Sequence, residues 1–161
     1  MKVPIDQCKK SLAGLWGGAS VVFFLLTLYE TQVGPLSFQQ QQAWGWMFQN
    51  LLPTLSLIVG VLGADATKPD SGTRTVDRFF FRIALGTSAF YLVTMMLTFV
   101  LSAVSYFNEV GGNNAWDPIE AMRNSTVYLG PLQGLTAAAL GVLFTKQEGP
   151  SAPDSAPART A

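Results

Sequence analysis

The chain has 161 residues with ten basic and ten acidic side chains, and its 12% share of charged residues excludes a soluble fold, in which about 25% is usual. The balanced charge argues against nucleic acid as a partner. One cysteine and no histidine exclude a zinc site, a haem histidine or a histidine-based catalytic triad, so we expect no metal, no cofactor and no enzymatic activity.

Four long apolar segments follow one another along the chain. Each approaches the ~20 residues that a helix needs to cross ~30 Å of hydrocarbon. A cleaved signal peptide is the alternative for the first segment, but this segment is long and no small-x-small cleavage site follows it. The sequence predicts an all-α, polytopic membrane protein with four transmembrane helices. The predicted spans lie at about 12–29, 43–64, 79–104 and 127–145, within a transmembrane domain of residues 1–146.

The basic residues gather on one side of the predicted spans. Nine of the ten lie in the N-terminal segment, in or beside the loop 65–78, or in the C-terminal tail, and only Arg123 lies on the other side. The positive-inside rule therefore places both termini and this loop in the cytoplasm. Small size and short loops favour a bacterial inner membrane. Arg78 and Arg82, one helical turn apart, form a basic edge suited to anionic lipid headgroups.

The second outer loop and the C-terminal tail have contrasting compositions. The run Asp117-Pro118-Ile119-Glu120 combines an N-cap acid with proline at the first helical position, which predicts a short amphipathic helix at about 117–124. The tail, residues 147–161, is rich in proline, alanine and serine. We expect it to be a disordered cytoplasmic segment.

Small residues recur at four-residue spacing in three of the four spans. In lipid, such spacing lets helix backbones approach closely. It predicts tight helix packing, either within one chain or between copies in a helical homo-oligomer. The predicted helix-packing residues are Gly14, Gly18, Gly60, Gly130, Gly134 and Ala138.

Neutral polar residues surround the proline of the second span. They are Gln49, Asn50, Pro53, Thr54 and Ser56. Three of them, Gln49, Pro53 and Ser56, fall on one helical stripe. An unpaired amide in hydrocarbon costs several kcal/mol, so these groups face either another helix or a water-filled pore. The spans carry no acidic residue at depth, which argues against a proton pump or an ion-coupled transporter.

Aromatic residues mark the expected membrane interfaces. Trp44, Trp46 and Phe48 lie at the outer end of the second span, and Trp16 lies near the inner end of the first. Tryptophan is enriched at both interfaces of a membrane. We therefore predict that these four side chains anchor the protein at the interfaces.

The leading functional hypothesis is an oligomeric pore lined by the polar face of the second span. A four-helix unit with small-residue faces and no catalytic group is suited to repetition in a homo-oligomer. The alternative is a non-conducting scaffold or sensor that recruits a cytoplasmic protein through the loop 65–78, for example as a bacterial defence or stress effector. The expected partners are the lipid bilayer and copies of the chain itself.

Overall fold

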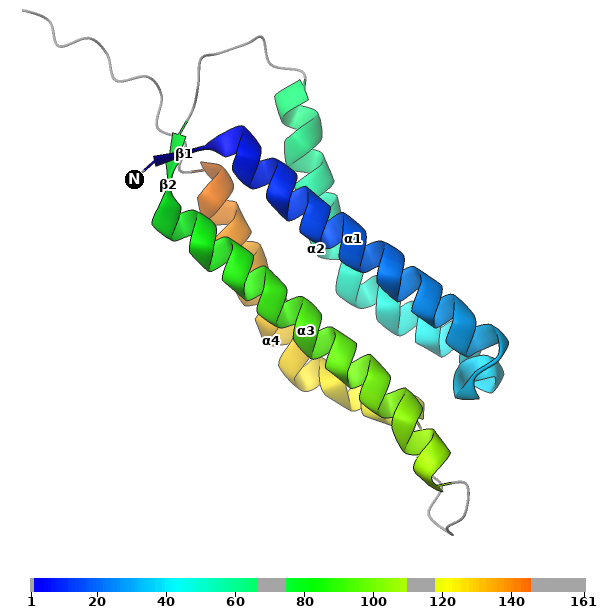
Figure 1. Ribbon diagram of the computed structural model, residues 1–161. Helices are drawn as coiled ribbons and strands as arrows, with labels where there is room; N and C mark the ends of the chain where they lie inside the picture. Colours follow the sequence, from blue (N-terminus) through cyan, green and yellow to red (C-terminus); the bar gives the residue numbers. More distant parts are fainter. Residues whose placement is uncertain (1, 67–74, 110–117, 146–161) are drawn as a thin grey trace, which may run out of the picture.

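The fold is an elongated bundle of four helices (Figure 1). The computed structural model describes residues 2–66, 75–109 and 118–145. Each of the four helices is long and apolar enough to cross a membrane, which confirms the all-helical class and the number of spans. The helices are α1 (Ile5–Gln32), α2 (Gln40–Ala66), α3 (Arg78–Glu109) and α4 (Pro118–Thr145), with a short 3-10 helix η1 (Pro35–Gln39) between α1 and α2.

The helices extend beyond the predicted spans because their polar ends continue the backbone hydrogen bonding. The largest difference is in α4, which begins at Pro118 and runs without a break to Thr145. The prediction of a separate helix at 117–124 is therefore wrong, since no proline or glycine between Pro118 and Gly130 interrupts the helix. Three parts of the predictions lie outside the described residues: residue 117, the tail 147–161, and residues 67–74 of the loop 65–78 that is predicted to recruit a partner.

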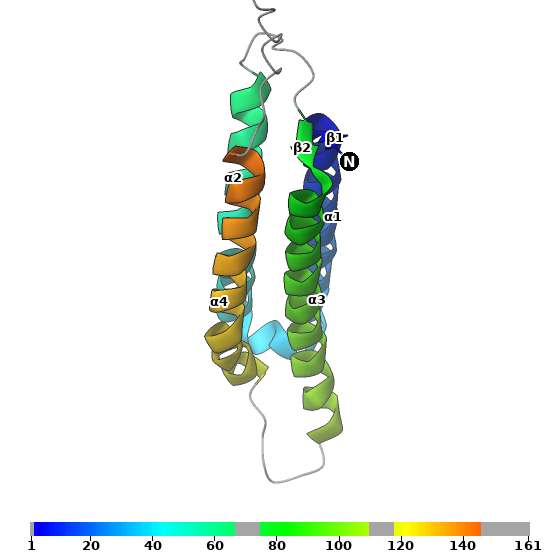
Figure 2. The same ribbon diagram turned by 90° about the vertical axis from the view of Figure 1, so that its left-hand side faces the viewer.

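The order of the helices around the bundle is α1, α2, α4, α3. Figure 2 shows α2 and α4 in one layer and α1 and α3 in the other. The bundle thus has two layer faces, the α2/α4 face and the α1/α3 face, and two sides, the α1/α2 side and the α3/α4 side. Because the chain runs up and down, α2 and α4 are parallel to each other.

A short β-ribbon closes one end of the bundle. Strand β1 (Lys2–Pro4) pairs in antiparallel fashion with β2 (Thr75–Asp77), and Val3 lies opposite Val76. The ribbon joins the N-terminus to the start of α3. We call this end the ribbon end and the opposite end, where η1 lies, the η1 end. The sequence did not predict these strands because each has only three residues and its partner is about seventy residues away.

Asp77 caps the first turn of α3. Its Oδ1 accepts a hydrogen bond of 3.1 Å from the backbone N–H of Phe79. We expect Asp77→Ala to lower the free energy of unfolding by about 1 kcal/mol. Asp77→Asn, which keeps an acceptor oxygen, should lower it by less. Chemical denaturation in detergent micelles measures both variants, and an equal loss in the two would contradict the cap.

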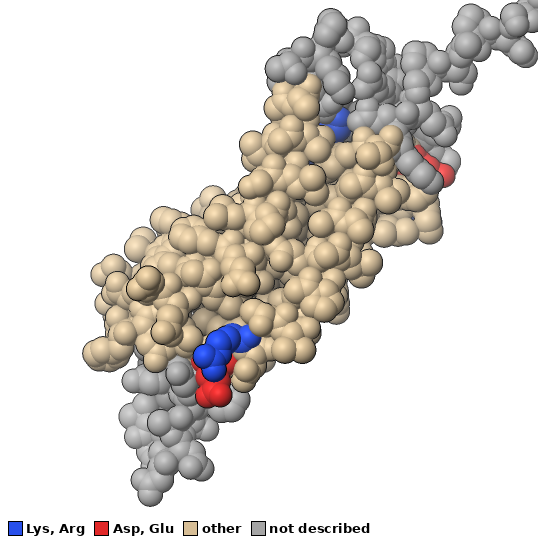
Figure 3. Space-filling model, turned by 180° about the vertical axis from the view of Figure 1, so that it is seen from behind, with Lys and Arg blue, Asp and Glu red and all other residues tan. Residues whose placement is uncertain are grey.

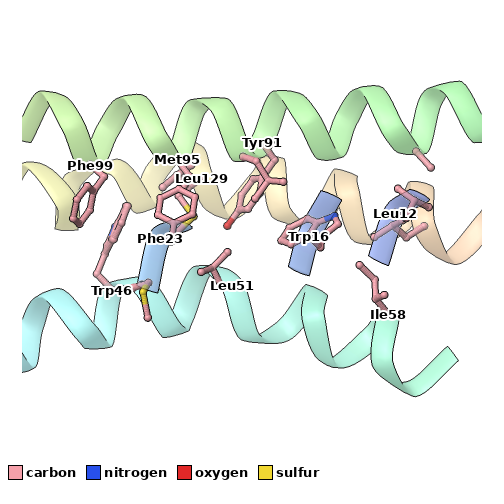
Figure 4. Packing of buried hydrophobic residues seen from close by; sticks show 14 of the residues in the cluster. Leu12, Trp16, Phe23, Trp46, Leu51, Ile58, Tyr91, Met95, Phe99 and Leu129 are labelled. Carbon is pink, nitrogen blue, oxygen red and sulfur yellow. The ribbon is translucent and has the colours of Figure 1, made fainter. Parts of the chain in front are cut away.

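Aromatic side chains from three helices pack among leucine, isoleucine and methionine in the core (Figure 4). The rings of Trp16 and Tyr91 stack with centroids 5.8 Å apart, and those of Trp46 and Phe99 stack at 6.4 Å. Trp16 is fully buried and Trp46 is 7% exposed. The prediction that these two tryptophans are interface anchors is therefore wrong. Their large rings fill the space between helices, where packing is the main attraction available in lipid.

Candidate functional site

The structure separates the polar residues of the second span onto two faces of α2. Gln49, Pro53 and Ser56 are exposed on one face, as the predicted stripe requires. Asn50 and Thr54 are 3% and 2% exposed and point into the bundle. Successive helical residues are rotated by about 100°, so neighbours in the sequence take different roles. Only the first three are therefore open to the surroundings of a single chain.

Asn50 joins three helices through its backbone and side chain. Its carbonyl oxygen accepts a hydrogen bond from the hydroxyl of Tyr91 in α3 at 2.8 Å and one from Nε2 of Gln133 in α4 at 3.2 Å. Its own Nδ2 donates to the carbonyl of Trp46 at 2.8 Å. One turn nearer the η1 end, Nε1 of Trp46 donates to Ser125 at 3.1 Å. Asn50 is therefore an interhelical residue within one chain.

Pro53 explains why this junction lies at Asn50. A proline within a helix has no N–H to donate to the carbonyl four residues earlier, here that of Gln49, and it loosens the preceding turn. In a membrane, such a turn is tolerated where neighbouring helices supply new donors. The hydroxyl of Tyr91 and the amide of Gln133 are such donors, and they reach the carbonyl next to the one that Pro53 leaves unpaired.

Three buried polar atoms near this junction have no hydrogen-bond partner in the described part of the chain. They are Nε1 of Trp16, Oγ1 of Thr54 and Oγ of Ser88. Thr54 is one turn from Asn50, and Ser88 is one turn from Tyr91, against which Trp16 stacks. An unsatisfied buried donor costs about 1–3 kcal/mol. These three atoms are therefore the polar groups of this layer that the described residues leave unsatisfied.

Small and polar residues follow the seam between α2 and α4 on the outside of the bundle. Each helix contributes one residue per turn, at spacings of three and four, so each set forms a continuous stripe. The stripe on α2 consists of Gln42, Gly45, Gln49, Pro53, Ser56 and Gly60, and the stripe on α4 consists of Arg123, Thr126, Gly130, Gly134, Ala137 and Gly141. We call the two together the seam stripe.

At the η1 end the seam stripe opens into a cleft of about 400 Å³. Its walls are Gln42, Gly45 and Gln49 from α2 and Arg123 and Thr126 from α4. Apolar side chains of Trp46, Ile119 and Met122 complete its lining. Figure 3 shows this face of the molecule, where charged side chains lie only near the two ends. The long middle of the face is uncharged, as a membrane-spanning surface requires.

The opposite, α1/α3 face has a different character. Of the large hydrophobic side chains that are exposed on helices, thirteen belong to α1 or α3 and seven to α2 or α4. Phe90 and Val93 on α3 are each more than half exposed. Because lipid tails favour such side chains, the α1/α3 face is the one suited to contact lipid. The α2/α4 face carries the seam stripe and fewer exposed side chains of this kind.

The two sides of the bundle carry a ridge and a groove. On the α1/α2 side, the ring of Trp44 lies 5.2 Å from that of Phe24 and 5.6 Å from that of Phe48, and these three residues form what we call the aromatic ridge. On the α3/α4 side lies a groove of about 300 Å³. The groove is lined by Thr94, Leu97, Thr98, Leu101, Ser102, Ala121 and Tyr128.

The predicted helix-packing residues do not pack helices together within the chain. A methyl group added at Gly14, Gly18, Gly60, Gly130 or Gly134 would meet no atom of another helix within 4 Å. Ala138 is exposed as well. The helices instead approach through larger buried side chains such as Leu12, Leu129 and Leu140. Packing between copies, the other part of this prediction, stays a prediction.

The predicted headgroup-binding residues, Arg78 and Arg82, are exposed in the first turns of α3 at the ribbon end. No group of three potential metal ligands occurs within the described ranges.

The sequence-based prediction missed Tyr91, the junction partner of Asn50, because nothing in the local sequence marks a tyrosine inside an apolar span as a hydrogen-bonding residue. Gln133 was visible as a polar residue in its span, but its partner was not.

The chain was also compared with known proteins. No family model, no curated protein and no solved structure matches it. The geometry of the α2/α4 face therefore carries the functional argument alone.

Proposed function

We propose that this protein is an integral membrane protein that assembles as a ring of identical copies around a polar pore. The α2/α4 face of each copy borders the pore, and the α1/α3 face contacts lipid. The observation that carries this proposal is the seam stripe, with Gln49 exposed at its centre. We propose in addition that both termini lie in the cytoplasm and that the membrane is a bacterial inner membrane.

The cost of exposing an amide to lipid supports the orientation of the α2/α4 face. Gln49 lies close to the middle of the candidate span Leu36–Ala64, and its side chain has no hydrogen-bond partner among the residues that the structure describes. Exposure to hydrocarbon costs an amide several kcal/mol, whereas a water-filled pore removes most of that cost. The same argument applies to Ser56. Asn50 and Thr54 are excluded from the lining because the bundle of a single chain buries them.

The positions of the aromatic ridge and the groove support a ring. The stacked rings of Trp46 and Phe99 place the ridge on α2 and the groove on α3 at the same height along the bundle, on opposite sides. Copies related by rotation about the membrane normal keep the same depth, so the ridge of one copy meets the groove of the next. Such a head-to-tail contact closes into a ring when the rotation closes.

The experiment that tests the pore is Gln49→Leu in planar bilayers. We expect single-channel conductance to fall by about tenfold or more, the effect of a barrier raised by about 1.4 kcal/mol, while the fold is retained. Val59→Leu, at an exposed position on the other flank of α2, is the matched control and should conduct normally.

Copy number provides an independent check on the ring. Native mass spectrometry of the detergent-purified chain should give a single stoichiometry of four or more copies. A monomer or a dimer, or unchanged conductance in a well-folded Gln49→Leu variant, would contradict the proposed pore.

A further inference from the structure

We infer that the cleft at the η1 end of the seam stripe binds an anionic group. All its residues belong to one chain, so the site does not depend on the proposed pore. Its lining contains a single charged residue, Arg123. A volume of about 400 Å³ falls within the range of pockets that hold small molecules.

The donors in the cleft are available for a ligand. The side chains of Arg123, Gln42 and Gln49 make no hydrogen bond or ion pair with any residue in the described ranges. Thr126 differs, because its hydroxyl already donates to the carbonyl of Arg123 at 2.6 Å. A guanidinium and two amides offer several N–H donors, and a guanidinium pairs well with carboxylate or phosphate groups.

The apolar walls of the cleft strengthen the attraction. Trp46, Ile119 and Met122 give part of the site apolar walls, and a charge interaction is stronger beside apolar surface than in bulk water. The nearest acidic residue in the sequence, Glu120, is exposed and is not among the cleft residues. It therefore serves as a control position for the argument.

Iodide quenching of Trp46 fluorescence tests the site. In a Trp44→Phe, Trp116→Phe background, the two remaining tryptophans are Trp46, which lines the cleft, and Trp16, which is fully buried. We expect Arg123→Gln to reduce quenching by iodide about fivefold, as loss of an attractive charge predicts, and to leave quenching by neutral acrylamide unchanged. Added chloride, acetate or phosphate should compete with iodide.

Two further variants make the result decisive. Arg123→Lys keeps the charge and should retain most of the iodide quenching, and Glu120→Gln should not reduce it. Equal iodide quenching in the original chain and in Arg123→Gln overturns the site, and so does loss of quenching in Arg123→Lys.

The bilayer composition then separates two sources of the anionic group. Because an anionic bilayer repels iodide by itself, the original chain and Arg123→Gln are compared in the same nanodiscs. If the cleft takes a lipid headgroup, the difference in iodide quenching between the two chains is present in phosphatidylcholine nanodiscs and lost in phosphatidylglycerol nanodiscs. If it takes a free anion, the difference persists in both. Neither result depends on conductance, so a chain that binds iodide but does not conduct would contradict the pore alone.

Discussion

Tyr91→Ala is expected to lower the free energy of unfolding by about 3–5 kcal/mol, the usual cost of removing a large buried aromatic side chain. Tyr91 is fully buried, and its ring stacks on that of Trp16 at 5.8 Å. Its hydroxyl donates to the carbonyl of Asn50. The substitution therefore leaves a cavity beside Trp16 and removes one donor from the turn that Pro53 loosens. Reversible unfolding in mixed micelles measures the loss.

A neighbouring residue provides the matched control. Phe90 precedes Tyr91 on the same helix but is 61% exposed, so Phe90→Ala should cost less than about 1 kcal/mol. Tyr91→Phe keeps the ring and removes only the hydroxyl, which should cost about 0.6 kcal/mol, the average for a hydrogen bond between membrane helices. Similar losses in Tyr91→Ala and Phe90→Ala would contradict the core described above.

The contrast between these two residues shows how far the sequence alone could lead. Helix number and approximate bounds were predictable because crossing a membrane requires a minimum apolar length. The inward direction was not predictable, because a helix in lipid is apolar both toward its neighbours and toward the tails. Trp16 and Phe24 look alike in the sequence, yet the first is fully buried and the second is half-exposed.

Polar residues were more informative than apolar ones, but only along one helix. The stripe of Gln49, Pro53 and Ser56 could be predicted because helical periodicity is a local property. The contact between Asn50 and Tyr91 joins residues 41 positions apart, and no local pattern encodes it. The glycines were predicted as packing residues from their spacing along single helices. The direction in which they point depends on the arrangement of all four helices, which that spacing does not encode.

A cysteine pair across the proposed ridge–groove contact is expected to convert the chain into a ladder of cross-linked oligomers. Leu97 lines the groove on α3 and is 55% exposed, and Phe48 belongs to the ridge and is 41% exposed. Phe48 lies two residues after Trp46, and Leu97 lies two residues before Phe99. Because α2 and α3 run in opposite directions and each residue adds about 1.5 Å along a helix, both positions are displaced equally from the stacked pair toward the ribbon end. They therefore lie at the same height. We therefore expect Phe48→Cys with Leu97→Cys to form disulfides between neighbouring copies.

The background and the controls separate a ring from chance collisions. Cys8 is the only cysteine of the chain and is replaced by alanine, so each disulfide arises from the introduced pair. Val22→Cys with Val93→Cys places the same chemistry at exposed positions of α1 and α3, which contact lipid in the ring, and should remain monomeric after oxidation. A variant with only one of the two introduced cysteines cannot cross-link a head-to-tail contact. We expect its oxidation to give no more than a faint band of dimer. Equal ladders from the two pairs would contradict the ring, because a specific head-to-tail contact joins opposite sides of the bundle and leaves the α1/α3 face free.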